Sequence, residues 1–420
     1  MLFEIPFEKF LLKKALKERF HQRIKKSTVL GTDGISSKQF SVILDSEIDL
    51  IQRKVKDMTY RFSRFNEKLI LKDKSSPPRA VYIPTVRDRL VLHALNGYLV
   101  EAFSEDLKAY QKSVTENTIE IIGILEKEKF DTFIKLDVKN FFPSLDHEIL
   151  LNKIKNKIQD KTALSLLKKA LNRSNQGIAQ GLSIASQLAA IYLNDLDKQL
   201  NNHTNFKYFR FVDDILILCN KSDAETIYLE IQQQMTELKL DLHATEIGGK
   251  SEYGSLETDT LEYLGFSFKG NKISVRESTV EKLRKKLREK IAEIYKNKGN
   301  KKLEPEDYRE LNLKITGCLY NNKAYGWLFF FKNINDMELL YHLDWFVKKS
   351  FDDFGLIYDP KNIKSFVKSY FKINSLKPFK LDSNSYIPSF SNKIIMVSLD
   401  ELNENLLELL LNKNKKLILD

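Results

Sequence analysis

Three aspartates stand where carboxylates could do chemistry. Two of them, Asp213 and Asp214, are adjacent in residues 209–218, between two runs of β-branched and aromatic residues. Such runs predict a strand–turn–strand hairpin with the acidic pair at its bend. Two like charges between apolar strands are costly unless they are paired or bind a cation. Taken alone, an exposed acidic turn is the simpler interpretation, because Asp suits the backbone of tight turns.

The third carboxylate, Asp137, lies near the C-terminal end of a predicted strand at residues 132–138. An Asp inside such an apolar strand is either paired or a ligand. Mg²⁺ prefers carboxylate oxygens, and two such ions roughly 3.5–4 Å apart can activate a hydroxyl and hold a triphosphate. Asp137 and Asp213 have the residue type for that site if adjacent strands bring them together.

A basic loop at residues 72–79 leads into a predicted strand at residues 80–83. Lys72, Lys74 and Arg79 could clamp a triphosphate, because Arg offers a planar fork of donors and Lys a point charge. A solvated surface loop explains the same residues equally well.

A glycine-rich loop at residues 176–183 precedes a predicted helix at residues 184–200. Gly177 and Gly181 bracket Gln180, and backbone N–H groups in such a loop suit a nucleotide or a base pair. Ordinary loop-to-helix geometry is an equally good interpretation.

Two other charged clusters are expected to be structural. Arg87, Asp88 and Arg89 precede a helix predicted from residue 90, where ion pairs are the favoured interpretation. Asp146 is interpreted as a helix N-cap and His147 as a partly buried side chain, rather than as an acid–base pair.

The composition favours a polyanionic partner. The 420 residues carry a net charge of +11 and a pI of about 9.2, which points to nucleic acid before a membrane surface. The two cysteines, Cys219 and Cys318, form no metal-binding pattern, and neither a signal peptide nor a membrane-length apolar run is recognised. We therefore expect a cytoplasmic protein that does not bind a membrane.

The remaining elements are predicted from periodicity. An amphipathic helix is expected over residues 5–26, with Phe10, Leu11, Leu12, Ala15 and Phe20 buried. Strands are expected at residues 60–65 and 261–268, the latter joined through Gly270 to a strand at residues 272–275.

From residue 277 the chain becomes helical and basic. Apolar residues at helical spacing are expected to form its buried stripe, namely Val280, Leu283, Leu287, Ile291 and Ile294. Arg284, Lys285 and Arg288 lie among them and could follow a phosphate backbone. A domain boundary is predicted near residues 270–276.

In this order and spacing, the motifs over residues 25–275 resemble those of reverse transcriptases. The resemblance is carried by Asp33-Gly34, by residues 78–89, by residues 137–142, by residues 177–183, by Phe211-Val212-Asp213-Asp214 and by Leu264-Gly265-Phe266. Ala179 stands where these enzymes usually have Pro, and Phe211 where they usually have Tyr. Neither change removes a metal ligand.

The resemblance implies a role for each matched residue. Asp137, Asp213 and the main-chain carbonyl of Val138 would bind two Mg²⁺ ions, with Mn²⁺ as an alternative and Asp214 as an acidic partner. Phe142 would exclude a ribose 2′-hydroxyl. Bound dNTP would contact Arg79 with Lys72 or Lys74, and also Gln180, while Lys250 would donate a proton to pyrophosphate. The primer grip would comprise Leu264, Gly265 and Phe266.

The implied fold is α+β, a right-hand polymerase with fingers, an antiparallel-sheet palm and a helical thumb. Its expected divisions are an N-terminal helical extension (1–30), fingers and palm (31–275, with a palm core at about 130–147 and 177–275) and a thumb-like, RNA-binding C-terminal lobe (276–420).

The implied activity is RNA-directed DNA synthesis from dNTPs on a structured non-coding RNA, in antiphage defence. The resemblance is greatest to defence-associated bacterial reverse transcriptases, relatives of retron, abortive-infection and group II intron enzymes. Template-independent or protein-primed synthesis, a retron-type enzyme and a non-catalytic RNA-binding protein are the alternatives, and a homo-oligomer is left open.

Overall fold

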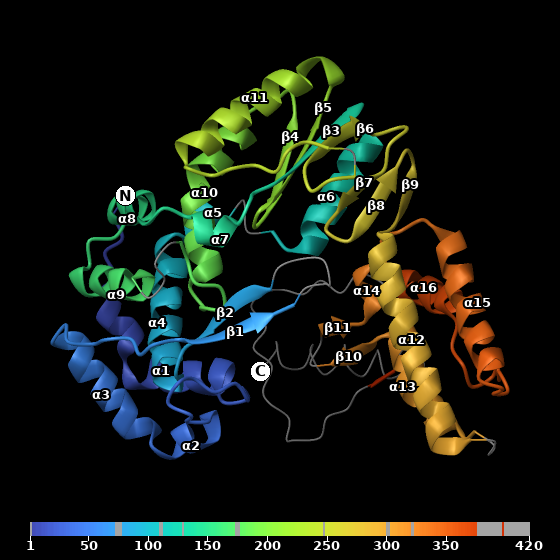
Figure 1. Ribbon diagram of the computed structural model, residues 1–420, viewed down its shortest axis with the longest axis horizontal. Coiled ribbons are helices and arrows are strands. Elements are labelled where there is room, and N and C mark those ends of the chain that lie inside the picture. Colours follow the sequence, from blue (N-terminus) through green and yellow to red (C-terminus); the bar gives the residue numbers. More distant parts are fainter. Residues whose placement is uncertain are drawn as a thin grey trace, which may run out of the picture. The chain divides into compact units, whose positions relative to one another are not determined.

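The computed structural model describes residues 2–71, 78–108, 112–127, 130–172, 177–246, 248–299, 303–320, 323–375 and 397–398. The chain divides into two compact units, Met1–Ser255 and Leu256–Asp420 (Figure 1). This division precedes the boundary expected at residues 270–276, because the strands around Phe266 pack with the C-terminal helices. The Phe266 ring lies 4.9 Å from that of Phe331 and 6.1 Å from that of Phe330.

A four-stranded antiparallel sheet organises the first unit. It consists of β3 (Thr132–Asp137), β4 (Lys207–Phe211), β5 (Asp214–Cys219) and β6 (Glu252–Ser255), in the order β4-β5-β3-β6. The central strands β3 and β5 are buried except at Asp137 and Asp214, which lie directly opposite each other. The sheet therefore buries its apolar length and leaves its carboxylates at one end.

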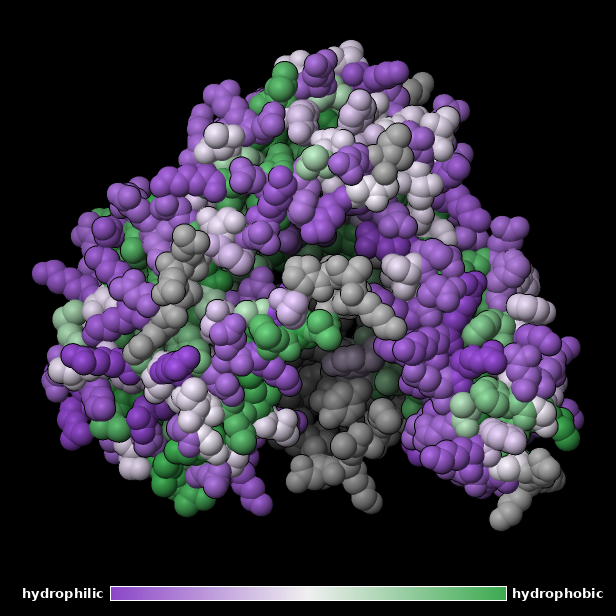
Figure 2. Space-filling view, in the orientation of Figure 1, coloured by the Kyte–Doolittle hydropathy of each residue, from purple (hydrophilic) through white to green (hydrophobic). Residues whose placement is uncertain are grey.

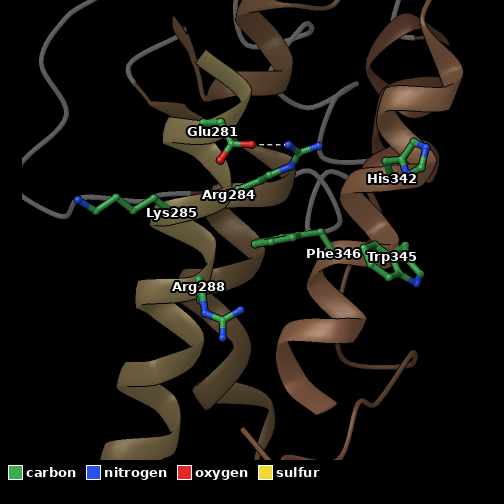
Figure 3. A pocket seen from close by; sticks show the side chains of 7 residues that line it. All are labelled: Glu281, Arg284, Lys285, Arg288, His342, Trp345 and Phe346. Carbon is green, nitrogen blue, oxygen red and sulfur yellow. Dashed lines mark hydrogen bonds and ion pairs between the residues drawn. The ribbon is translucent and has the colours of Figure 1, made fainter. Parts of the chain in front are cut away.

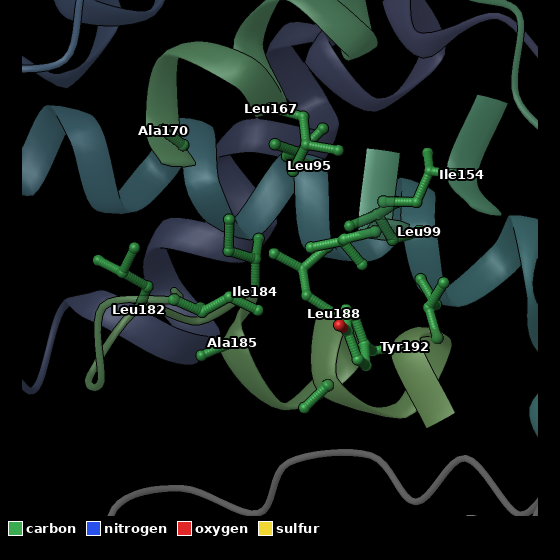
Figure 4. Close-up of a cluster of buried hydrophobic side chains, with 14 of the residues drawn as sticks. Leu95, Leu99, Ile154, Leu167, Ala170, Leu182, Ile184, Ala185, Leu188 and Tyr192 are labelled. Carbon is green, nitrogen blue, oxygen red and sulfur yellow. The ribbon is translucent and has the colours of Figure 1, made fainter. Parts of the chain in front are cut away.

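Helices bury the apolar surface beside this sheet. The core in Figure 4 joins α4 (Val86–Ala102), α8 (His147–Lys155), α9 (Lys161–Leu171) and α10 (Ala185–Asn201), through Leu95, Leu99, Ile154, Leu167, Leu188 and Tyr192. Four further helices belong to this unit: the short α5 (Ser104–Leu107) and α7 (Phe141–Ser144), and the longer α6 (Val114–Lys127) and α11 (Lys221–Glu237).

The N-terminal segment is not the single helix expected over residues 5–26. It forms η1 (Phe7–Leu11), α1 (Lys13–Arg19) and η2 (Phe20–Ile24), because the backbone of Leu12 is extended (φ −55°, ψ 140°). That break shifts the helical register, so Leu12 is 55% exposed and Leu16 is buried instead. The helices α2 (Ser37–Val42) and α3 (Leu44–Lys56) follow, and the Ser36 side chain caps α2.

The strand expected at residues 60–65 is wrong. The hairpin strands are β1 (Asn66–Ile70) and β2 (Arg79–Ile83), while residues 60–65 are irregular. The buried carboxylate of Asp88 replaces strand pairing there, since it accepts hydrogen bonds from the Ser63 amide (3.0 Å) and the Tyr60 hydroxyl (2.8 Å). Asp88 is thus structural, as predicted, and α4 begins at Val86, before the expected residue 90.

The glycine-rich loop ties β2 to the segment after β3. A Cβ on Gly177 (φ +60°) would lie 2.3 Å from the carbonyl oxygen of Phe142, and one on Gly181 (φ +99°) would lie 2.7 Å from that of Tyr82. The Tyr82 amide also donates to the carbonyl of Gln180 (2.7 Å). Both glycines are therefore required by close backbone approach, and the loop joins the basic hairpin to the end of the sheet.

A buried ion pair shapes the turn between β4 and β5. Val212 adopts φ +62°, which is rare for a β-branched residue. Arg210, 8% exposed, donates from Nη1 to the Val212 carbonyl (2.9 Å) and from Nε to Oδ1 of Asp197 (2.7 Å). Asp197 is fully buried and also accepts from the Tyr208 hydroxyl (2.8 Å). Burial alone would lower the pKa of Arg210, but Asp197 outweighs it and raises that pKa above its ordinary value.

The second unit begins with the antiparallel strands β7 (Leu261–Tyr263), β8 (Phe266–Lys269) and β9 (Lys272–Val275). The single strand expected over residues 261–268 is wrong, because Leu264 (φ +50°) and Gly265 (φ +87°) both take the left-handed conformation of a hairpin turn.

The helices of this unit are α12 (Glu277–Lys298), α13 (Pro305–Thr316), α14 (Trp327–Phe330), α15 (Met337–Asp353) and α16 (Phe366–Ser375). The strands β10 (Cys318–Tyr320), β11 (Lys323–Tyr325) and β12 (Val397–Ser398) form a small sheet. The predicted buried stripe of α12 is confirmed at all five positions. The α+β fold class is confirmed, and no helix within the described ranges has both the length and the apolarity to cross a membrane.

The buried pair beneath the turn predicts a specific stability pattern. Arg210→Met strands the Asp197 carboxylate without its counter-charge, so unfolding free energy should fall by about 3–5 kcal/mol in urea titrations. Adding Asp197→Leu should recover much of that loss, because the unpaired buried charge is gone. Lys153→Met, which breaks a pair with the exposed Asp195, is the control and should cost under about 1 kcal/mol. Equal losses in the single and double variants would rule out this coupling.

Candidate metal and nucleotide site

The pairing of β3 with β5 places Asp137 beside the β4–β5 turn that carries Asp213. Phe211 pairs with Asp214, so the two turn residues are Val212 and Asp213, one position earlier than the expected bend. Burial raises the pKa of Asp213 above its ordinary value, and the negative charge of Asp137 raises it further. The charges of Arg79 and Lys250 act in the opposite direction. Residues far apart in the sequence thus meet at one end of the sheet.

The donor atoms at this end suit a hard cation. Asp137 and Asp213 repel each other, and a bound divalent ion would relieve that repulsion. Along β3 and beyond, the carbonyl of Asp137 accepts from the His243 amide, and the Lys139 amide donates to Asp241. Successive carbonyls of an extended chain point to opposite sides, so the Val138 carbonyl faces the edge occupied by β5.

The side chains alone do not make a closed metal cage. Among the residues that the structure describes, no group of three or more His, Cys, Asp or Glu side chains could hold a metal ion. A cation at Asp137 and Asp213 would need further oxygens, from the Val138 carbonyl, from water or from a triphosphate. Asp214 pairs with Asp137 across the strands, and its role as a ligand stays a prediction.

Two basic side chains flank Asp137. The Lys250 ammonium lies 3.9 Å from Oδ1 of Asp137, and Nε2 of His243 lies 3.3 Å from the same oxygen. The Lys250 ammonium (Nζ) and the His243 imidazole (Nε2) lie 3.1 Å apart. Lys250 was predicted to lie here, but His243 was not. His243 is placed by the pairing of residues 241–243 with the end of β3, through its own amide bond to the Asp137 carbonyl and the bridge between Val138 and Leu242, and this pairing appears only once the chain is folded.

The sequence-predicted nucleotide residues lie around this end of the sheet. Arg79 is exposed at the start of β2. Phe142 is half-buried on α7, its ring 5.5 Å from that of Phe141. Gln180 is half-buried in the glycine-rich loop, whose backbone contacts both the Phe142 segment and β2. Lys72 and Lys74 lie outside the described residues.

The other predicted residues belong to the second unit. In the expected primer grip, Leu264 and Gly265 form the β7–β8 turn, but the Phe266 side chain is only 1% exposed. The Phe266 side chain is therefore part of the core beneath the turn. A ligand would contact the turn residues Leu264 and Gly265 instead. Arg284, Lys285 and Arg288 line a groove between α12 and α15 (Figure 3).

The raised pKa of Asp213 predicts a pH-dependent stability change. Its neutral form stabilises the fold, and that contribution is complete below the ordinary Asp pKa of about 3.9 and lost as pH rises through the raised value. Asp213→Asn stays neutral, so without divalent ions it should unfold at a higher temperature than the wild type at pH 7 and equally at pH 3.5.

Calorimetry across that pH range, with and without Mg²⁺, measures the effect. Mg²⁺ should raise the wild-type unfolding temperature more than that of Asp213→Asn. Asp57→Asn, at the exposed end of α3, should show neither effect. A pH-independent difference between Asp213→Asn and the wild type would contradict the repulsion between the two carboxylates.

Part of this chain is similar to known proteins. Residues 70–268 match the family described as reverse transcriptase (RNA-dependent DNA polymerase). The putative COX1/OXI3 intron 2 protein of Saccharomyces cerevisiae is 26% identical over 156 residues, which are 31% of this chain and 18% of that protein. The group II intron-encoded protein LtrA of Lactococcus lactis is 25% identical over 206 residues, 45% of this chain and 34% of that protein. The chain thus spans about a third or less of these curated relatives.

Among solved structures, telomerase of Candida albicans in complex with a fragment of telomeric RNA covers 80% of this chain and 62% of its own at 14% identity, with a TM-score of 0.46. Apo telomerase from Candida tropicalis covers 79% of this chain and 69% of its own chain at 12% identity, with a TM-score of 0.43. The family match and the intron-encoded relatives carry the conclusion instead. Residues 70–268 of this chain are similar to the reverse transcriptase domain, as parts of the intron-encoded proteins are to this chain.

Proposed function

We propose that this chain is an RNA-directed DNA polymerase that adds dNTPs to a 3′-hydroxyl, with two Mg²⁺ ions at Asp137 and Asp213. The observation that carries the proposal is that Asp137 lies opposite Asp214, beside the turn that carries Asp213, with the Lys250 ammonium 3.9 Å from Asp137, all within residues that match the reverse transcriptase family. Bound cations would activate the hydroxyl and neutralise the triphosphate. The buried pair of Arg210 and Asp197 would keep Asp213 in place for them.

The basic side chains have distinct proposed roles. Arg79, with Lys72 or Lys74, would hold the triphosphate, because a guanidinium can donate two parallel hydrogen bonds to phosphate oxygens. Lys250 would supply a proton to the departing pyrophosphate. Its ammonium lies within reach of both Asp137 and His243, so the imidazole can relay a proton to it from solvent.

Phe142 would select the sugar. Its backbone carbonyl is held in place, because the Ile178 amide donates to it (2.8 Å) and Gly177 packs against it. A ring held in that position can exclude a ribose 2′-hydroxyl, while Gln180 on the same loop contacts the nascent base pair.

The broader role rests on the sequence motifs. We propose that the template is a structured non-coding RNA, that Leu264 and Gly265 grip the primer, and that the enzyme acts in antiphage defence in the cytoplasm. Template-independent or protein-primed synthesis at the same site is the second candidate, because the metal site does not depend on how the 3′-hydroxyl is presented. A non-catalytic RNA-binding protein is less well supported, since Asp137 and Asp213 are both present and near enough for their charges to interact.

The polymerase proposal is tested by incorporation of labelled dNTPs with purified protein, its co-purified RNA and Mg²⁺. Asp213→Ala/Asp214→Ala should reduce incorporation by at least about 10³-fold, because the shared cation ligand is lost. Asp57→Ala is the control on the same unit and should behave as the wild type. Full incorporation by the double variant would refute the metal site. Product that forms without RNA but needs Asp213 would support the template-independent candidate.

Phe142→Ala should relax sugar selection. Removing the ring opens space for a 2′-hydroxyl, so the ratio of kcat/KM for dNTP to that for NTP should fall by about tenfold or more, largely through faster NTP use. Phe141→Leu, the neighbouring ring that is buried in the core, tests whether general loosening gives the same result. An unchanged ratio in Phe142→Ala would remove the steric-gate role.

A further inference from the structure

A hollow in the second unit is lined by cationic side chains of α12 and aromatic side chains of α15 (Figure 3). Its volume is about 490 Å³, and it lies between α12 and α15. Arg284, Lys285 and Arg288 come from α12, while His342 and Trp345 project from α15. A second hollow of about 370 Å³ shares His342 and Trp345 and adds Tyr341 and the acidic Glu338, so the two form one continuous surface.

The aromatic wall is unusually exposed. Trp345 is 61% exposed and Tyr341 is 62% exposed. They stand four residues apart on α15, so they share one face about 6 Å apart along the helix axis. Large aromatic rings that are left open on one helix face are typical of binding surfaces, since their burial there would release ordered water. Two flat rings at this spacing can each stack on one base.

The cationic wall can be freed for a ligand. Arg284 pairs with Glu277 and Glu281, and Arg288 with Asp353. These pairs are exposed to solvent, and such pairs contribute only about 0–1 kcal/mol each. Replacing these carboxylate partners by a phosphate therefore costs little free energy.

The charge of the wall favours a polyanion. Lys285 is 78% exposed and 3.9 Å from the carboxylate of Glu289. Basic residues outnumber acidic ones along α12, and hydrophilic side chains cover that helix in Figure 2. Only Glu281 contributes a negative charge to the first hollow.

We propose that the α12–α15 groove binds a short unpaired segment of RNA. Its bases stack on Trp345 and Tyr341, and its phosphates face Arg284, Lys285 and Arg288. A duplex hides the faces of its bases, so this aromatic wall selects single-stranded nucleotides. The inference rests on the proposed function for the identity of the polyanion as RNA, and it adds a second contact, apart from the Asp137–Asp213 site.

The test measures affinity for a ten-nucleotide oligouridylate by fluorescence anisotropy at fixed salt. All variants carry Asp213→Ala/Asp214→Ala, so the measurement does not depend on polymerisation. Trp345→Ala should weaken binding by about tenfold or more, as expected for the loss of one stacking ring, and Trp345→Phe should retain most of the affinity. Arg284→Gln/Arg288→Gln should weaken binding and reduce its dependence on salt concentration. Phe371→Ala, an exposed ring on α16, is the control and should bind as the parent.

The outcomes separate the two proposals. A wild-type protein that incorporates no dNTP but loses oligouridylate affinity through Trp345→Ala would refute the polymerase and support the groove. Equal affinity of Trp345→Ala and its parent, or equal affinity for a duplex of the same length, would overturn the groove proposal. Sedimentation velocity adds a further check: if Trp345→Ala changes the oligomeric state and leaves RNA affinity intact, the surface binds protein instead.

Discussion

The buried ion pair between Asp197 and Arg210 is the interaction that holds the turn at the carboxylate end of the sheet. Asp197 comes from α10 and Arg210 from β4, so the pair fastens a helix to the edge of the sheet. The same guanidinium holds the carbonyl of Val212, a residue in a conformation that few β-branched side chains adopt. Breaking either partner would release that turn, and Asp213 is its second residue. A costly buried charge thus secures the position of another charge.

A second constraint joins the sheet to the basic hairpin. Gly177 and Gly181 approach the backbones of Phe142 and Tyr82 more closely than any side chain would permit. The loop between them therefore couples β2, which carries Arg79, to the segment that carries Phe142. Since all these elements belong to the first unit, the groups proposed to bind the triphosphate, the sugar and the metal ions form one packed body.

Sequence reasoning succeeded where periodicity was long or a motif was complete. The buried stripe of α12 and the β4–β5 hairpin are examples. It failed where one residue changed the local geometry. An extended Leu12 split the N-terminal helix, and the left-handed pair Leu264 and Gly265 turned an apparent strand into a hairpin. At residues 60–65, alternating aromatic and polar residues predict a strand, but in the structure hydrogen bonds to the Asp88 carboxylate take the place of strand pairing.

The residue types of the proposed metal site follow from the sequence alone, because Asp137 and Asp213 lie in motifs whose order and spacing are specific. Only the tertiary structure decided what surrounds them. His243 lies 3.3 Å from Asp137 beyond the end of β3, and Trp345 of α15 lines the same hollow as Arg284 of α12. Neither contact follows a local period. Such neighbours arise from packing, which brings together residues that no spacing rule relates.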